Sequence, residues 1–302
     1  MKTVTTPREV RESTSAARSA GARIGFVPTM GALHAGHASL VRLARRRTGY
    51  VAASIFVNPK QFSPKEDLAR YPRDVERDAR LLEELECDLL FLPSEKDIYS
   101  PADRTRVSVD GLSDVLCGAS RPGHFGGVTL VVAKLFNIVR PDEAYFGQKD
   151  AQQAVIIQRM AADLDFPVRI VLGATVREAD GLAMSSRNAY LAPAARTGAP
   201  AMYRALCAAK RSIEQGERNP VPLMAAMRRG MEGAGFDVDY ASIVEAATLR
   251  PVAAVEGTIL MACAGTIGAT RLIDNIALAV SGNRAEEVLL EFPEWSRYAE
   301  KR

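Results

Sequence analysis

The sequence predicts an α/β protein with a parallel sheet, followed by a smaller α+β domain. Short apolar runs alternate with longer segments of helical spacing through the first half of the 302 residues, and this alternation is typical of βαβ units. The apolar and charged fractions, 47% and 25%, are ordinary for a globular chain of this length. The pattern changes after about residue 175, where helical segments precede alternating runs.

The expected elements follow in chain order. Runs of β-branched or large apolar residues predict strands at 24–27, 50–57, 88–92 and 168–172. Helical spacing between them predicts helices at 38–47, 75–86, 128–139 and 151–164. Later in the chain, helices are expected at 194–215 and 221–233, and strands at 238–244 and 258–264. We expect a first domain at 1–175, a smaller one at 176–283, and a helical tail of unknown role at 284–302, broken at Pro293.

Composition argues against several classes of protein. The net charge is only +3, from 39 basic and 36 acidic residues, which does not indicate a nucleic-acid binder. The four cysteines lie far apart without a C-x-x-C pair, so a disulfide or zinc site is not expected. No signal core and no apolar run of membrane-spanning length occurs. We therefore expect a cytoplasmic protein that binds neither membrane nor nucleic acid, although the basic run 42–47 could attract RNA.

Two of the three histidines lie in the turn His34-Ala35-Gly36-His37, between an apolar run and a helical pattern. A strand–turn–helix junction presents free N–H groups and the positive end of the helix dipole, which suit a triphosphate. The two imidazoles could also bond phosphate oxygens as charge develops on a leaving group. The alternative is an incidental pair in an ordinary turn.

A second candidate is the segment 145–150, in which Gly147, Lys149 and Asp150 precede a predicted helix. Gly147 permits a close backbone approach, and Lys149 could act as a point charge on phosphate. Gln153 lies one helical turn after Lys149, so its amide could bond a polar substrate. Asp150 also suits a helix N-cap, which is its alternative role.

A third candidate is Met184-Ser185-Ser186-Arg187, whose hydroxyls and guanidinium could bind an oxyanion or could cap a polar loop. A fourth is the neutral group Asn58, Gln61 and Phe62, which suits a small hydroxylated carboxylic acid better than a phosphate. Tyr71 and Arg121 stand in Pro-containing loops and could either reach this site or only shape the loops.

Taken together, these segments resemble the pantoate–β-alanine ligase family of the H-x-G-H nucleotidylyltransferase superfamily. The resemblance covers about Gly25 to Asn275 and is carried by PTMGALHAGH, SIFVNPKQF, LARYPRD, RPGHFGGV, KLFNIVRPDEAYFGQKDAQQ, VREADGLAMSSRNAYL and TRLIDN. It implies a Rossmann-like doubly wound parallel sheet of the nucleotidylyltransferase type, a smaller C-terminal lid domain and a homodimer. It also implies that ATP and pantoate form pantoyl adenylate and pyrophosphate, after which β-alanine displaces AMP to give pantothenate.

The resemblance also assigns roles to residues. His37 is implied as proton donor, and His34, Lys149 and Arg187 complete the catalytic set. The residues implied to bind ATP are Met30, Gly31, His34, His37, Gly147, Lys149, Asp150, Val176, Met184, Ser185, Ser186 and Arg187. Those implied for the other substrates are Gln61, Gln153, Asn58, Arg121 and Tyr71.

Magnesium is expected with ATP, held mainly by phosphate oxygens and water. The acidic metal site of the family is only partly present, because Asp78 matches it whereas Arg77 stands where some members have Asp. The alternative function is a nucleotidylyltransferase that transfers AMP or CMP to a phosphorylated acceptor. That enzyme would share the H-x-G-H turn but would need basic residues where this chain has Asn58, Gln61 and Phe62.

Overall fold

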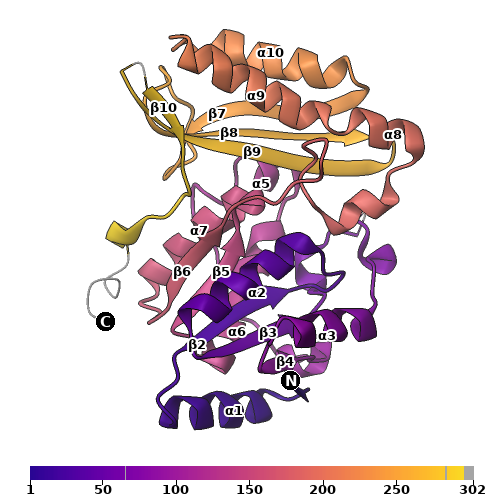
Figure 1. The fold of residues 1–302 in the computed structure, drawn as a ribbon, viewed down its shortest axis with the longest axis vertical. Helices are drawn as coiled ribbons and strands as arrows, with labels where there is room; N and C mark the ends of the chain where they lie inside the picture. Colours follow the sequence, from indigo (N-terminus) through magenta and orange to yellow (C-terminus); the bar gives the residue numbers. More distant parts are fainter. Residues whose placement is uncertain (65, 283, 296–302) are drawn as a thin grey trace.

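The computed structural model describes residues 1–64, 66–282 and 284–295. The N-terminal part of these residues forms a six-stranded sheet in the order β1-β4-β3-β2-β5-β6 (Figure 1). Every pairing in it is parallel, which confirms the predicted fold class. The strands are β1 (Lys2–Val4), β2 (Ile24–Thr29), β3 (Tyr50–Ile55), β4 (Leu89–Phe91), β5 (Glu143–Gly147) and β6 (Arg169–Gly173).

Helices cover both faces of this sheet. Phe26 of β2 packs in one core cluster and Val27 in another, because successive strand residues point to opposite faces. The Phe26 side is covered by α1, α6 and α7, and the Val27 side by α2 and α3. The helices are α1 (Pro7–Ser19), α2 (Ala35–Arg47), α3 (Val75–Glu84), α4 (Glu95–Ile98), α5 (Cys117–Ser120), α6 (His124–Val139) and α7 (Ala151–Asp163). This is the doubly wound, Rossmann-like arrangement that the sequence predicts.

The strand order reverses between β2 and β5. The chain proceeds from β2 outward through β3 to β4, and β5 and β6 then extend the sheet on the other side of β2. Crossovers that diverge in this way leave a crevice at the carboxyl ends of β2 and β5, where open α/β sheets bind ligands. The His34 turn follows β2 and Lys149 follows β5. The topology therefore brings these two segments to one crevice.

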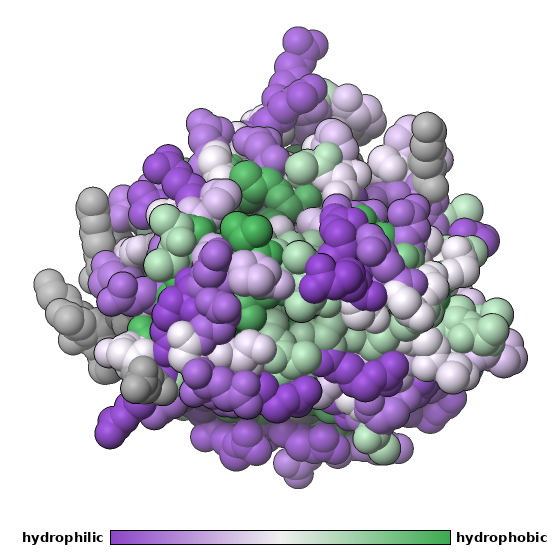
Figure 2. Space-filling view, turned by 90° about the horizontal axis from the view of Figure 1, so that it is seen from above, coloured by the Kyte–Doolittle hydropathy of each residue, from purple (hydrophilic) through white to green (hydrophobic). Residues whose placement is uncertain are grey.

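The C-terminal part forms a separate antiparallel sheet in the order β10-β9-β8-β7. Helices α9 and α10 cover one face of it (Figure 1). Figure 2, which views the molecule from above, shows hydrophobic and near-neutral surface at the centre, with hydrophilic side chains around it. The elements are α8 (Pro193–Gly198), α9 (Ala201–Glu214), α10 (Pro220–Glu232), β7 (Phe236–Glu245), β8 (Gly257–Ile267), β9 (Thr270–Ser281) and β10 (Arg284–Glu287). Within the described ranges, no helix combines the length and apolarity needed to cross a membrane.

Some expectations about single elements are wrong. The helix predicted at 194–215 is two helices, because Pro200 ends the hydrogen-bonded run between α8 and α9. The tail is not helical from 284 to 295: it begins with strand β10 and ends in a single 3₁₀ turn, Pro293–Trp295. Residues 296–302 of that prediction lie outside the described residues. Strand β9 is not among the predicted strands, because the charged residues Arg271 and Asp274 interrupt its apolar pattern. In the structure Arg271 pairs with Asp239, and Asp274 pairs with Arg177.

Candidate active site

The His34 turn is built by local capping. Helix α2 begins at Ala35, three residues before the prediction, because His34 is its N-cap. The N–H of Gly36 donates to His34 Nδ1 at 3.1 Å, and the N–H of His34 donates to His37 Nδ1 at 3.4 Å. A Cβ on residue 36 would lie only 2.9 Å from the His34 ring. The H-x-G-H spacing is thus a reciprocal cap made by two imidazoles, and the glycine leaves room for one of them.

These caps also orient the rings. Because each Nδ1 accepts a backbone N–H, a neutral ring carries its proton on Nε2. Burial, assisted by Lys149, lowers the pKa of His34 to about 4. Burial, assisted by His34, lowers the pKa of His37 to about 3. The two ring centroids are 4.2 Å apart. The pair therefore offers two neutral N–H donors at pH 7.

We predict that all three histidines titrate well below their usual pKa of about 6.5. The third, His124, has its pKa lowered to about 4 by burial and by Arg121. Because the unfolded chain takes up these protons near pH 6.5, the folded state should lose stability as the pH falls from 6.5 to 4. Imidazole NMR shifts followed from pH 8 to 4 test this, together with thermal unfolding. A midpoint near 6.5 for His37 would contradict the neutral pair.

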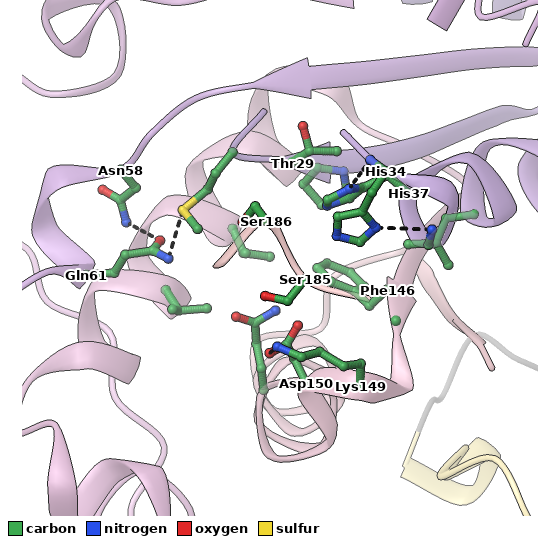
Figure 3. A pocket seen from close by; sticks show the side chains of 18 of the residues that line it. Thr29, His34, His37, Asn58, Gln61, Phe146, Lys149, Asp150, Ser185 and Ser186 are labelled. Atoms are coloured by element: carbon green, nitrogen blue, oxygen red, sulfur yellow. Dashed lines mark hydrogen bonds and ion pairs between the residues drawn. The ribbon is translucent and has the colours of Figure 1, made fainter. Parts of the chain in front are cut away.

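Lys149 lies in the turn Gln148–Asp150, between β5 and α7. Its ammonium is 3.5 Å from the Asp150 carboxylate. Figure 3 shows both side chains across the cavity from the histidine pair, with Ser185 between the two groups. The side chain of Asn275, on β9, donates to the carbonyls of Gln148 and Lys149 at 2.9 and 3.0 Å. Asp150 stands at the N-cap of α7, yet its side chain makes no capping bond.

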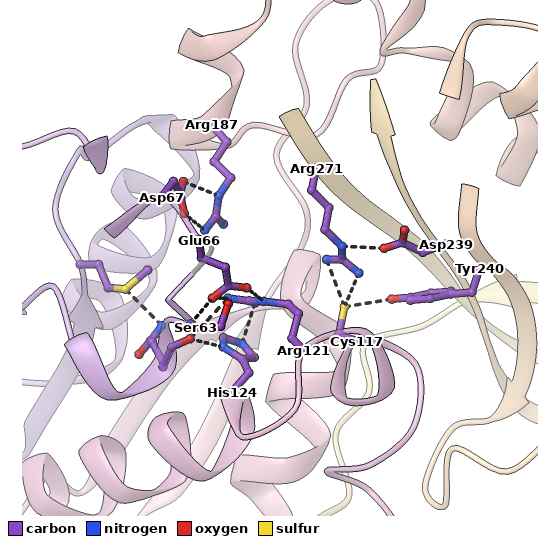
Figure 4. A network of polar contacts seen from close by, with 12 residues as sticks. Ser63, Glu66, Asp67, Cys117, Arg121, His124, Arg187, Asp239, Tyr240 and Arg271 are labelled. Atoms are coloured by element: carbon purple, nitrogen blue, oxygen red, sulfur yellow. Dashed lines mark hydrogen bonds and ion pairs between the residues drawn. The ribbon is translucent and has the colours of Figure 1, made fainter. Parts of the chain in front are cut away.

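The 184–187 segment reaches the same cavity from the C-terminal part. Ser185 Oγ caps the 3₁₀ turn Ser186–Tyr190 by accepting the N–H of Arg187 at 3.3 Å, so the capping alternative is also correct. Arg187 forms a two-bond pair with Asp67, with both bonds at 3.0 Å (Figure 4). The hydroxyls of Ser186 and Tyr71 lie 3.2 Å apart. These contacts connect the segment to the loop that follows β3.

Asn58 orients Gln61. The Asn58 amide donates to Gln61 Oε1 at 2.9 Å and to the carbonyl of Gly127 at 3.0 Å. Its oxygen accepts from the Tyr99 hydroxyl at 2.8 Å and from the Lys60 N–H at 3.2 Å. The amide is therefore fully used. A Cβ on residue 127 would lie 2.2 Å from the Lys60 carbonyl, so only glycine lets α6 approach this turn.

One cavity collects nearly all of the predicted site residues. Those that line it are Met30, His34, His37, Asn58, Gln61, Tyr71, Arg121, Gly147, Lys149, Asp150, Gln153, Val176, Met184, Ser185, Ser186 and Arg187. Gly31 and Asp78 are not among its lining residues. Instead, they border another cavity next to Met30.

Asp78 is buried, and its Oδ1 accepts the N–H of Leu33 at 2.9 Å. Its other oxygen has no hydrogen-bond partner among the described residues. Burial raises the pKa of this carboxyl group. In the described part of the chain, no three His, Cys, Asp or Glu side chains come together to hold a metal ion. Asp78 therefore anchors the loop before His34, and its role as a metal ligand stays a prediction.

His124 is a cavity residue that the sequence reasoning did not single out. Its Nδ1 donates to the carbonyl of Gln61 at 2.8 Å, and its Nε2 accepts from Arg121 at 2.9 Å. Arg121 also pairs with Glu66 (Figure 4). The sequence offered one signal for His124: it is one of only three histidines in the chain. In the structure it is the first residue of α6.

The basic run 42–47 is partly neutralised, because Arg45 pairs with Asp88 and Arg47 pairs with Glu143.

The match to known proteins agrees with this geometry. A family model described as pantoate-beta-alanine ligase matches residues 2–277. The chain belongs to the pantoate-beta-alanine ligase family. The expected resemblance is therefore confirmed. The cavity lies where the strand order of the sheet reverses, between β2 and β5.

Named ligases of this family are similar over nearly the whole chain. The pantothenate synthetase of Moorella thermoacetica is 51% identical over 282 residues, 93% of this chain and 100% of the relative. The solved pantothenate synthetase of Thermus thermophilus has a TM-score of 0.86 at 46% identity, over 91% of this chain and 99% of its own. The pantoate-beta-alanine ligase of Francisella tularensis, solved with beta-gamma ATP and beta-alanine, has a TM-score of 0.75 at 34% identity. That similarity covers 91% of this chain and 97% of the Francisella chain.

Proposed function

We propose that this chain condenses pantoate with β-alanine, using ATP and releasing AMP and pyrophosphate through a pantoyl-adenylate intermediate. Membership of the ligase family supports this proposal. The observation that carries it is the single cavity in which the His34 turn, Lys149 and the 184–187 segment meet the neutral amide of Gln61. Cationic and N–H donors suit a triphosphate, whereas the amide suits a hydroxy acid. A phosphorylated acceptor would instead require basic side chains beside Gln61, so transfer of a nucleotidyl group to such an acceptor is disfavoured.

In the first step, the pantoate carboxylate attacks the α-phosphorus of ATP and pyrophosphate leaves. Both reactants are anionic, so catalysis requires charge neutralisation and alignment. We assign the Nε2–H groups of His34 and His37 and the ammonium of Lys149 to the phosphate oxygens. Each well-placed donor contributes roughly 2.7–4 kcal/mol to such a transition state. Since His37 is neutral, we assign it hydrogen-bond donation rather than delivery of a proton from an imidazolium.

Arg187 and the remaining cavity residues complete the assignment. The Nη1 group of Arg187 is not part of its pair with Asp67, so that group is assigned to a phosphate. Ser185 and Ser186 supply hydroxyl donors beside it, and Met30, Gly147, Asp150, Val176 and Met184 surround the nucleotide. Gln61 and Gln153 are assigned to pantoate. The buried Asn58 acts by fixing Gln61, and Arg121 and Tyr71 form the wall.

In the second step, the amine of β-alanine attacks the acyl carbon and AMP leaves. An acyl adenylate hydrolyses in water, so the site must exclude water while the adenylate is bound. We propose that the smaller domain, with a boundary near residue 175, covers the cavity as a lid. Magnesium would be held with ATP mainly by phosphate oxygens and water, where it would neutralise phosphate charge. We further propose a cytoplasmic homodimer.

The test is a coupled assay of AMP formation, with pantoate and β-alanine each omitted in turn. We expect sustained AMP release only with both acids present. With pantoate alone, a single turnover that releases one pyrophosphate per site is expected. Pyrophosphate release triggered instead by a phosphorylated acceptor would replace this function with nucleotidyl transfer.

A further inference from the structure

Residues 288–292 cross from the C-terminal sheet to the N-terminal domain. They follow β10 and run down past β6 and α7 (Figure 1). The Gln148 side chain donates to the carbonyl of Val288 and accepts the N–H of Leu290, both at 2.8 Å. The Gln158 side chain donates to the carbonyl of Leu290 at 2.7 Å and accepts the N–H of Phe292 at 3.0 Å. Two side-chain amides thus bind alternate residues, as a neighbouring strand would. We call residues 288–292 the strap.

The strap is packed as well as hydrogen-bonded. Leu290 is only 1% exposed and belongs to the core that contains α7. The carboxylate of Glu291 accepts the N–H of Leu172, on edge strand β6, at 3.2 Å. Just beyond, the Phe292 ring stacks on Trp295 with the centroids 4.3 Å apart. Gln148 and Gln158 are themselves buried. The Gln158 amide nitrogen also donates to the carbonyl of Ala154, whereas the strap supplies the N–H groups of Leu290 and Phe292 to the two buried side-chain oxygens.

The strap reaches the active site through one turn. Gln148 is the first residue of the turn that carries Lys149. Asn275 holds the backbone carbonyls of this turn, while the strap holds the Gln148 side chain. The turn is therefore fixed from two directions, by β9 and by the strap. The family model ends at residue 277, so the strap lies beyond the part of the chain that the family model matches.

We propose that the strap positions the Lys149 ammonium against the ATP phosphates, through Gln148 and with Gln158 as its anchor on α7. This inference rests on the proposed role of Lys149 in binding ATP. Gln148 and Gln158 are positioning residues. A small displacement of a charged group lowers the productive fraction of bound nucleotide. Loss of the strap should therefore affect ATP far more than pantoate.

The test uses Gln158→Ala and a chain that ends at Glu287. Gln158 does not line the active-site cavity. Besides its strap bonds, its side chain donates to the carbonyl of Ala154 within its own helix, so its substitution removes both strap bonds without altering a cavity residue. We expect each change to raise KM for ATP by roughly tenfold or more, with KM for pantoate unchanged. Amide hydrogen exchange at residues 148–150 should become faster in both. Gln158→Ala added to the shortened chain should have no further effect on KM for ATP, because both changes remove the same bonds between Gln158 and the strap.

The matched control is Lys210→Met, which removes the ion pair to Glu287 on β10 and leaves the strap bonds intact. It should keep the KM for ATP of the unmodified enzyme. A lower kcat with unchanged KM and unchanged exchange at 148–150 would mean a purely stabilising tail and would overturn the inference. So would additive effects of the two changes. If the shortened chain fails to fold, Gln158→Ala decides alone.

The exchange readout keeps this test separate from the proposed function. Exchange and calorimetric ATP affinity require no turnover. An unmodified enzyme that forms no AMP from the two acids would refute the function, whereas normal turnover with unaltered exchange in Gln158→Ala would refute only the strap.

Discussion

His37→Ala should lower the rate of adenylate formation by roughly 10²- to 10³-fold, the effect of removing one preorganised oxyanion donor. Pantoate affinity should change little, because the ring lies at the helix α2 turn and not beside Gln61. The measurement is single-turnover pyrophosphate release, with pantoate affinity measured separately by calorimetry. An unchanged first step would remove His37 from the catalytic set.

His37→Asn distinguishes two kinds of catalysis by this residue. An amide retains an N–H donor but cannot transfer a proton at neutral pH. Because the pKa of His37 is about 3, we expect hydrogen bonding to dominate and Asn to recover part of the lost rate. Equal loss in the Asn and Ala variants would instead indicate proton transfer.

Lys149→Met should produce a loss of similar size, seen in both KM for ATP and the rate of the first step. Methionine approximates the length of the lysine stem but removes the charge that faces the phosphates. ATP affinity measured by calorimetry should fall together with kcat/KM, and pantoate affinity should be retained. Loss of pantoate binding without loss of ATP binding would contradict the assignment.

Lys134→Met provides the matched control for Lys149→Met. This variant removes the same charge from α6, where the Lys134 ammonium pairs with Asp103 at 3.1 Å. Lys134 does not line the cavity. We expect its ATP affinity to equal that of the unmodified enzyme. A comparable loss in both variants would indicate a general electrostatic effect rather than a contact made by Lys149.

Much of the N-terminal domain could be predicted because its signals are local. The apolar runs at 24–27 and 50–57 became β2 and β3, since buried parallel strands require continuous apolar residues. Strand β9 could not be predicted in this way, because Arg271 and Asp274 interrupt its apolar pattern and are accommodated only by ion pairs to residues outside the strand. The tail differs from the prediction for the same kind of reason: the backbone of Val288, Leu290 and Phe292 is bound by the side chains of Gln148 and Gln158, which precede these residues by more than 100 positions.

The sequence by itself determined the alternation of strands and helices, the family, and the H-x-G-H turn, whose caps join residues no more than three apart. Only the tertiary structure decided that His34, Lys149 and Ser185 face one cavity, that the Asn58 side chain orients Gln61, and that the strap binds the turn that carries Lys149. The physical reason is range. Helical and strand periodicity and capping depend on neighbours along the chain, whereas these contacts depend on where each crossover returns the chain to the sheet.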